Sequence, residues 1–331
     1  MRPWQFLRAS LRCAALLAGI SLAFGPSAQA AMNFCAAPAL QSNETTLDAP
    51  AVQTLTRDVS AHLGDTPRVR AHLHVQQPGD ADDLTLGDLS LMRDAALAWR
   101  VTNDSRYLAF VNRYLNAWVD TYQPSFNPFD ERRFADLILA YDMTASVLRI
   151  DARNNTAAFI GKLGNGYARQ ALAAPVAAPG QPDEAQNLRI ELIAQAGFTL
   201  SDRTLMTTAR ALYDRQIGQL RTTGAAVPAS AASASNGDAV QQLEPLVITA
   251  LAARRFSRTL LNQRAPNGIS LADALDAAAP GASADDAEVY YLAARLDGRY
   301  ERIARRLAPH APGWIAACLP LSAAPPLQLP H

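Results

Sequence analysis

Apolar residues recur along most of this chain at the spacing of α-helices. The clearest stripe consists of Tyr107, Phe110, Val111, Tyr114, Leu115 and Trp118. A second stripe consists of Phe134, Leu137, Ile138 and Tyr141, and a looser one of Leu205, Ala209, Leu212 and Ile217. Alternation typical of a strand is confined to Val69–Val75, where we expect one short extended piece. The pattern therefore predicts an all-α protein.

A helix–turn–helix pattern repeats three times. Helical segments that end near Trp99, Phe198 and Leu296 are each followed by a short polar turn and then by an arginine, at positions 106, 203 and 299. These arginines are 97 and 96 positions apart. Each turn places an Asp or Ser where a helix N-terminus needs an acceptor oxygen. Repeated antiparallel helix pairs predict an (α/α) toroid or incomplete toroid, with an open solenoid as the alternative.

Three segments interrupt the helical pattern. Ala173–Pro182 and Gly224–Asp238 are rich in small residues and proline, and we expect both to be loops. Residues 321–331 form a Pro-rich tail. Between the N-terminal leader and this tail, residues 31–320 are expected to form a single domain.

Residues 1–30 have the pattern of a secretory signal peptide. Arg2, Arg8 and Arg12 precede or flank the apolar run Cys13–Phe24, and Ala28–Ala30 provides small residues for cleavage. We expect cleavage near Ala30 and a periplasmic or secreted mature protein. No later segment approaches the roughly 20 apolar residues of a membrane helix, so no membrane span is expected.

The charge balance argues against a polyanion-binding protein. The chain has 30 Lys+Arg and 30 Asp+Glu, and removing the three arginines of the leader leaves 30 − 3 = 27 basic residues, a net charge of about −3. Such a balance provides no field that attracts nucleic acid. A negatively charged substrate would therefore need a local group of arginines. Lys162 is the only lysine, and arginine suits bidentate binding of carboxylates, although a compositional bias would explain this equally well.

Cys35 and Cys318 are the only cysteines after the leader. In an oxidising compartment they could form a disulfide that closes a loop of 318 − 35 = 283 residues. Alternatively, both are unpaired thiols, because the sequence does not report the distance between them. Neither looks catalytic or metal-binding. With no zinc-ligand spacing and no nucleotide or phosphate motif, we expect neither a metal nor another cofactor.

Several motifs resemble one known family. They are Ala95–Trp99, the turn Thr102–Tyr107, Leu115–Trp118, Asn127–Glu131, Ala140–Met143, Leu188–Ile190 and Leu243–Leu246. Together they are similar to the alginate lyase family of polysaccharide lyases, which are periplasmic α/α-toroid proteins. The likeness extends over about residues 65–300.

The resemblance implies β-elimination at a uronic acid of an acidic polysaccharide, without a cofactor. A polar group neutralises the sugar carboxylate, a base removes the C5 proton and an acid assists the departing oxygen. The chain departs from the family where a catalytic His is expected, because Leu188 follows Asn187 there. Residues 237–242 likewise contain neither the His nor the Tyr that the family offers.

Other side chains could take these roles. His72 and His74 lie two apart on the extended piece and are candidate bases, although ordinary hydrogen-bonded histidines would fit the pattern too. Tyr141 is the candidate acid, with a core tyrosine as the alternative. The substrate-binding candidates are Arg132, Arg133, Asn187 and Arg189.

Three functions remain open from the sequence. The first is a lyase that acts on a uronate polymer. The second is a catalytically degenerate relative that binds a glycan or a partner protein without turnover. The third is a protein-binding α-solenoid, for which the helix array alone would suffice.

Overall fold

The computed structural model describes residues 34–35, 49–75, 81–175, 183–220, 236–257 and 260–318. These residues form helices and connecting segments, and none of them is in a β-strand, so the prediction of an all-α protein is confirmed. The predicted leader (residues 1–30), the tail (residues 321–331) and most of the two predicted loops lie outside the described residues. In the part of the chain that is described, no helix is both long and apolar enough to span a bilayer.

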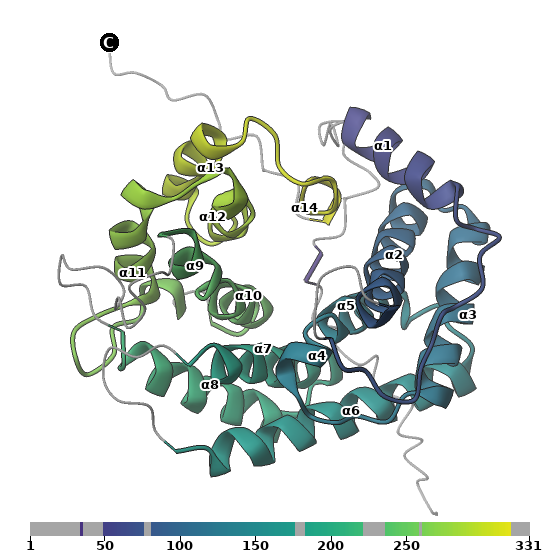
Figure 1. The fold of residues 1–331 in the computed structure, drawn as a ribbon, viewed down its shortest axis with the longest axis horizontal. Helices are drawn as coiled ribbons and strands as arrows, with labels where there is room; N and C mark the ends of the chain where they lie inside the picture. The colour runs from purple at the N-terminus through teal and green to yellow at the C-terminus, as the bar shows by residue number, and fades with distance from the viewer. Residues whose placement is uncertain are drawn as a thin grey trace, which may run out of the picture.

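The helices form an incomplete ring of two layers (Figure 1). The inner layer contains α2 (Ala81–Thr102), α5 (Phe134–Thr144), α7 (Glu184–Leu200), α10 (Glu244–Ala253) and α12 (Ala287–Ala293). The outer layer contains α1 (Ala49–Ser60), α3 (Ser105–Thr121), α6 (Ile150–Ala173), α8 (Arg203–Ile217), α11 (Leu271–Ala278) and α13 (Glu301–Leu307). Two short helices, α4 (Pro128–Glu131) and α9 (Asn236–Gln241), precede α5 and α10. Consecutive inner helices contact one another, and each inner helix pairs with an outer neighbour. This arrangement is the predicted α/α toroid.

Burial explains which helices lie inside. Ten of the 11 residues of α5 are buried, since it packs on the outer layer and on both inner neighbours. In α3, by contrast, burial is confined to the six residues of the predicted stripe. The predicted stripe of α8 is buried as well. A helix that is apolar on all sides therefore becomes an inner helix, and one with a single apolar stripe becomes an outer helix.

The three predicted turns connect an inner helix to an outer one. Asp104 and Asp202 are the N-cap residues of α3 and α8, and Asp297 is the N-cap residue of the 3₁₀ helix Gly298–Tyr300, which leads into α13. Each carboxylate accepts a hydrogen bond from the backbone N–H two residues later, which satisfies a donor that the helix leaves free. The repeat in the sequence thus marks equivalent corners of the ring.

The structure corrects two local expectations. Residues 69–75 form no strand; the backbone N–H of Gln123 donates to the carbonyl of Ala71, and no described strand lies beside them. A lone segment without a partner strand cannot build a ladder. The second expected loop ends earlier than predicted, because residues 236–238 already belong to α9, while residues 224–235 lie outside the described residues.

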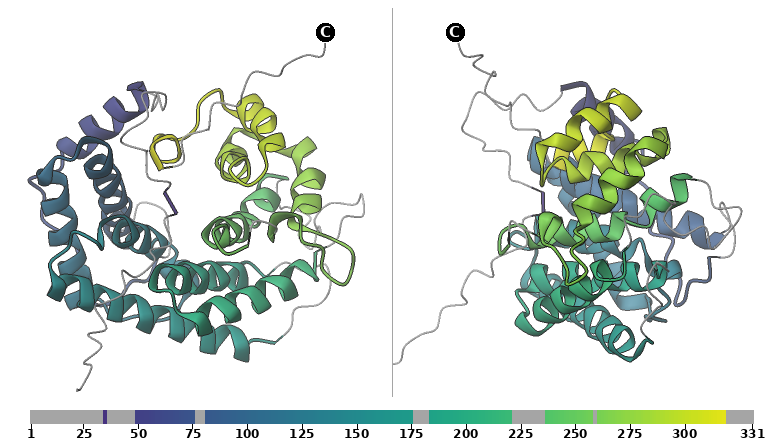
Figure 2. Two further views of the ribbon diagram at one scale, coloured as in Figure 1. Left: turned by 180° about the vertical axis from the view of Figure 1, so that it is seen from behind. Right: turned by 90° about the vertical axis from the view of Figure 1, so that its left-hand side faces the viewer.

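The two ends of the described chain meet at the gap in the ring. The short helix α14 (Gly313–Cys318) lies in the gap between α1 and α13 and contacts α1 and α2 (Figures 1 and 2). A disulfide joins Cys318 to Cys35, with 4.4 Å between their Cα atoms. The pairing that the sequence left open is thus present in the structure.

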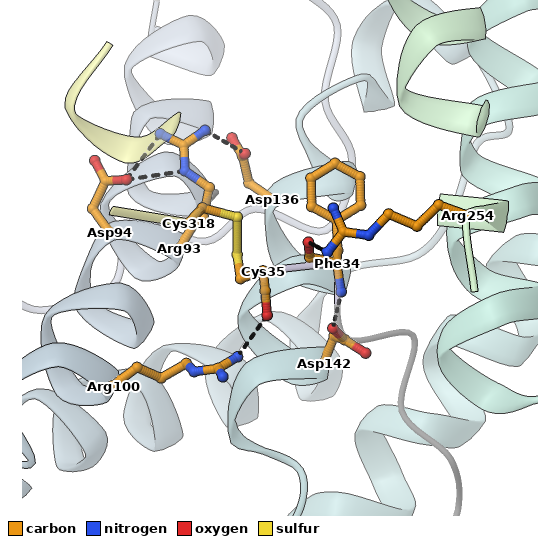
Figure 3. The surroundings of a disulfide bond; sticks show 9 residues. All are labelled: Phe34, Cys35, Arg93, Asp94, Arg100, Asp136, Asp142, Arg254 and Cys318. Atoms are coloured by element: carbon orange, nitrogen blue, oxygen red, sulfur yellow. Dashed lines mark hydrogen bonds and ion pairs between the residues drawn. A yellow bond between two sulfur atoms is a disulfide. The ribbon is translucent and has the colours of Figure 1, made fainter. Parts of the chain in front are cut away.

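The disulfide links α14 on one side to the short segment around Cys35 on the other. Side chains from inner helices bind this segment through hydrogen bonds (Figure 3). The N–H of Phe34 donates to Asp142, and the carbonyl of Phe34 accepts from Arg254. Arg100 donates to the carbonyl of Cys35. These three side chains come from the C-terminal ends of α5, α10 and α2, so the segment links three inner helices.

Candidate functional site

Charged side chains from five inner helices interact with one another on the inner side of the ring. We call this group the inner charge cluster; its members are Arg93 and Asp94 of α2, Asp136 of α5, Glu191 of α7, Glu244 of α10, Glu288 of α12, and Arg133 just before α5. Three of the acids, Asp136, Glu244 and Glu288, lie in the first turn of their helices. The positive end of the helix dipole stabilises negative charge there.

Arg93 anchors one side of the inner charge cluster. Its guanidinium donates to Asp136 at 2.7 Å and to Asp94 at 2.9 Å (Figure 3). Asp136 also accepts from the hydroxyl of Ser90 at 2.8 Å. Arg93 and Asp136 are both buried. Separating them would leave an uncompensated charge in the interior, which is strongly unfavourable, so the two side chains stay paired.

Two carboxyl groups of the cluster, Glu191 and Glu244, have raised pKa values. Burial raises the pKa of Glu244 to about 7; the charge of Glu288 adds to this effect and that of Arg133 opposes it. Burial, followed by the charge of Glu244, raises the pKa of Glu191 well above its usual range. Glu191 also accepts from the amide of Gln195 at 2.9 Å. Near neutral pH, Glu244 can therefore either donate or accept a proton.

Two exposed arginines provide positive charge beside these acids. Arg133 lies 3.8 Å from Asp136, and its charge opposes the rise in the pKa of both Glu191 and Glu244. Arg132 acts on Glu244 in the same direction. Because both arginines are exposed, their guanidinium groups are accessible to a ligand carboxylate.

A surface groove of about 650 Å³ lies between the start of α4, the end of α6 and the start of α7. Phe126, Asn127, Gln170, Asp183 and Arg189 are among the residues that line it. Arg189 is partly exposed; its guanidinium lies 3.4 Å from the Gln186 side chain, and its buried Nε has no hydrogen-bond partner. The groove thus combines an aromatic ring with polar groups and one cation.

A buried carboxylate shapes the wall of this groove. Glu131 accepts hydrogen bonds from the hydroxyls of Tyr122, Tyr167 and Ser125 and from the backbone N–H groups of Ser125 and Phe126. Phe126 has a left-handed backbone with φ of 61°, a conformation that costs about 1 kcal/mol or more for a non-glycine residue. Glu131 therefore holds Phe126 in a conformation that it would not adopt alone.

The predicted base candidates are accessible. His72 and His74 are exposed on either side of the buried Leu73. The His74 ring nitrogen Nδ1 lies 3.6 Å from Asp130, and its backbone N–H donates to Asp82.

Tyr141, the predicted acid, is placed differently. It is only 3% exposed and lies in the C-terminal half of α5, about 10 Å along the helix from Phe134. Burial raises the pKa of Tyr141, and the charge of Arg153 opposes this effect. The burial of Tyr141 and its place in the apolar stripe of α5 fit a core tyrosine, the alternative that the sequence left open.

Asn187 is also deeply buried. It is 1% exposed, and its amide donates to the backbone carbonyl of Gln242 at 2.9 Å, which ties α7 to the turn before α10. Its Oδ1 is buried without a hydrogen-bond partner. Of the four substrate-binding candidates, Arg132, Arg133 and Arg189 are therefore accessible, and Asn187 is not.

Sequence reasoning missed the acids Glu191 and Glu244. Glu244 lies in Leu243–Leu246, which the sequence suggested only as a scaffold motif. The signal that could have found both is a charged residue inside a segment that is apolar on all sides, because such a segment becomes an inner helix. No group of three or more His, Cys, Asp or Glu side chains arranged to hold a metal ion occurs within the described ranges.

Comparison with known proteins agrees with this architecture. The family model for alginate lyase matches residues 35–289. The chain belongs to the alginate lyase family. A crystal structure of an alginate lyase from Bacteroides ovatus has a similar fold, with a TM-score of 0.65 and 15% sequence identity, and the match covers 83% of this chain and 94% of that chain. No curated protein matches this member of the family.

The raised pKa of Glu244 predicts a pH-dependent stability change in the variant Glu244→Gln. Folding favours the protonated acid, so this carboxyl progressively destabilises the protein as the pH rises from about 4.5 to about 7. The glutamine variant is expected to be more stable than the wild type by about 3 kcal/mol at pH 8 and nearly equal to it at pH 4.5. Denaturant unfolding at the two pH values measures this difference.

The exposed Glu184 in the first turn of α7 provides the matched control. Glu184→Gln should change stability little, and equally at both pH values. If Glu244→Gln also gave the same difference at pH 4.5 and pH 8, the carboxyl would not titrate near neutrality in the folded protein.

Proposed function

We propose that this protein is a polysaccharide lyase that cleaves a uronate-containing polymer by β-elimination at the inner charge cluster. One observation carries the proposal beyond family membership. The charges of the exposed Arg132 and Arg133 act on Glu244, a carboxyl group of the cluster whose pKa burial raises to about 7. The two guanidinium groups suit the binding of a sugar carboxylate, and the Glu244 carboxyl suits proton transfer near neutral pH.

The reaction requires four linked events. A base takes the C5 proton of the uronate, the electron pair of that C–H bond forms the C4=C5 double bond, the C4–O bond breaks, and the departing oxygen receives a proton from a protonated side chain or from water. Arg132 and Arg133 would stabilise the negative charge that develops on the carboxylate when C5 loses its proton. The exposed His74, whose Nδ1 lies 3.6 Å from Asp130, is the proposed base, with Glu244 as the second candidate.

A turnover assay on purified protein tests the proposal. Incubation with uronate polymers should produce the absorbance of the unsaturated sugar. His74→Ala should lower kcat by about 100-fold or more, the typical contribution of a general base. His62 is a matched control, because it is exposed and also lies beside a carboxylate, with its Nδ1 2.8 Å from Asp65, so His62→Ala should leave kcat unchanged.

The outcomes separate the roles. Loss of activity in Glu244→Gln but not in His74→Ala would assign the base to Glu244. An absence of product from every uronate polymer with the wild-type protein would overturn the proposal.

A second function is favoured by specific residues. Leu188 occupies the position where the family resemblance predicts a catalytic His, and the neighbouring Asn187 is buried. A relative that binds an oligouronate without cleaving it would be consistent with both facts. Binding by calorimetry without formation of an unsaturated product would support this alternative.

The proposed location is the periplasm or the medium, after cleavage near Ala30. The leader-like pattern of residues 1–30 supports this location, as does the Cys35–Cys318 disulfide, because such bonds persist in oxidising compartments. Cell fractionation and N-terminal analysis of the mature protein would test it, and an uncleaved protein in the cytoplasm would contradict it.

A further inference from the structure

Helix α14 lies outside the part of the chain that matches the family. The family match ends at residue 289, whereas α14 spans Gly313–Cys318 and occupies the gap in the ring (Figure 1). The disulfide from Cys318 to Cys35 ties α14 to the segment held by α2, α5 and α10. The side chains that α14 presents on the inner side of the ring therefore come from outside the segment that the family model matches.

The side chain that α14 brings to the inner charge cluster is Trp314. The indole N–H donates to Glu288 of α12 at 2.9 Å. The guanidinium of Arg93 in α2 lies over the indole ring, 4.6 Å from its centre, in a cation–π contact. Trp314 therefore connects the two inner helices that flank the gap.

The indole is held in place and yet remains partly exposed. Arg93 is fixed by Asp94 and Asp136, so the cation beneath the ring cannot readily move. Buried Trp118 in α3, by contrast, is completely covered by the core. Trp314 is only partly buried, so part of its aromatic surface is accessible to a ligand.

The position of Trp314 relates it to the proposed chemistry. Its partner Glu288 is also the charged group that raises the pKa of Glu244 most, so Trp314 and Glu244 have Glu288 as a common neighbour. Sugar rings present C–H groups on their faces and polar groups at their edges. An aromatic face can pack against the C–H groups of a sugar, and nearby guanidinium and carboxyl groups can bind its polar groups.

We infer that Trp314 is a sugar-stacking platform that α14 adds beside the inner charge cluster, with an oligouronate as its ligand. This inference rests on the proposed function, because it takes the same class of ligand. Arg93 and Glu288 position the indole, and the disulfide keeps α14 in the gap.

Two Trp314 variants test the inference with the full-length mature protein and a saturated oligouronate. Calorimetry should show affinity about tenfold weaker in Trp314→Ala, equivalent to about 1.4 kcal/mol, and only slightly weaker in Trp314→Phe, which keeps an aromatic face. Binding should also change the tryptophan fluorescence of the wild type, and this change should disappear in Trp314→Phe. Trp99→Phe is the matched control, because Trp99 is also partly buried but lies on α2, and it should retain the fluorescence change.

The outcomes are distinct. Wild-type affinity in Trp314→Ala, or a full fluorescence change in Trp314→Phe, would overturn the stacking role and leave the proposed function standing. If the wild-type protein bound no oligouronate, both proposals would be overturned. Trp314→Phe preserves the size of the side chain, so its readout does not depend on whether the alanine variant folds.

Discussion

Replacing Cys35 and Cys318 with serine is expected to lower the free energy of unfolding by about 4 to 5 kcal/mol. The bond closes a loop of 283 residues, and chain-entropy arguments give large effects for long loops. It also holds α14 and the segment around Phe34 at the gap in the ring, so the expected loss includes those contacts. Guanidinium unfolding of the double variant and the wild type measures the difference.

The wild-type protein provides the control for this prediction. Adding a thiol reductant should bring its stability down to that of the double serine variant and should not affect the variant itself. Equal stability of the two proteins without reductant would show that the ring is held by packing alone.

Glu131→Ala is expected to cost about 3 to 5 kcal/mol, because it leaves several buried donors without their acceptor. The hydroxyls of Tyr122 and Tyr167 lose their partner, as do the backbone N–H groups of Ser125 and Phe126. Phe126 would also lose the contact that holds its left-handed backbone. Thermal or denaturant unfolding measures the cost.

A graded pair of variants makes the Glu131 result specific. Glu131→Gln keeps one acceptor oxygen and should destabilise less than Glu131→Ala, whereas the exposed Glu184→Ala should have little effect. If Glu131→Ala were no worse than Glu184→Ala, the buried hydrogen bonds would contribute nothing to the fold.

Much of the fold could be predicted from local patterns. The stripe from Tyr107 to Trp118 predicted α3, and the aspartates at 104, 202 and 297 predicted three helix N-termini. Periodicity and capping act between residues close in sequence, so they can be read without knowing the tertiary structure.

The site was less predictable. Arg132 and Arg133 were identified as candidates from their position at a helix start, and they do lie beside the inner charge cluster. Tyr141 belonged to an apolar stripe, and the structure buries it in α5. The resemblance to the family pointed to Asn187, which the structure uses to join α7 to Gln242. Proximity between helices about 50 residues apart is not encoded in any local pattern.

By itself, the sequence determined that this protein is helical, that its helices pair in a repeating array, and which family it resembles. Those properties depend on side-chain periodicity and short motifs along one segment. The tertiary structure alone decided that Cys35 meets Cys318, that Glu244 lies where burial raises its pKa to about 7, and that Trp314 reaches Arg93 and Glu288. Each of these depends on distances and on desolvation, which arise only when helices remote in sequence pack around one ring.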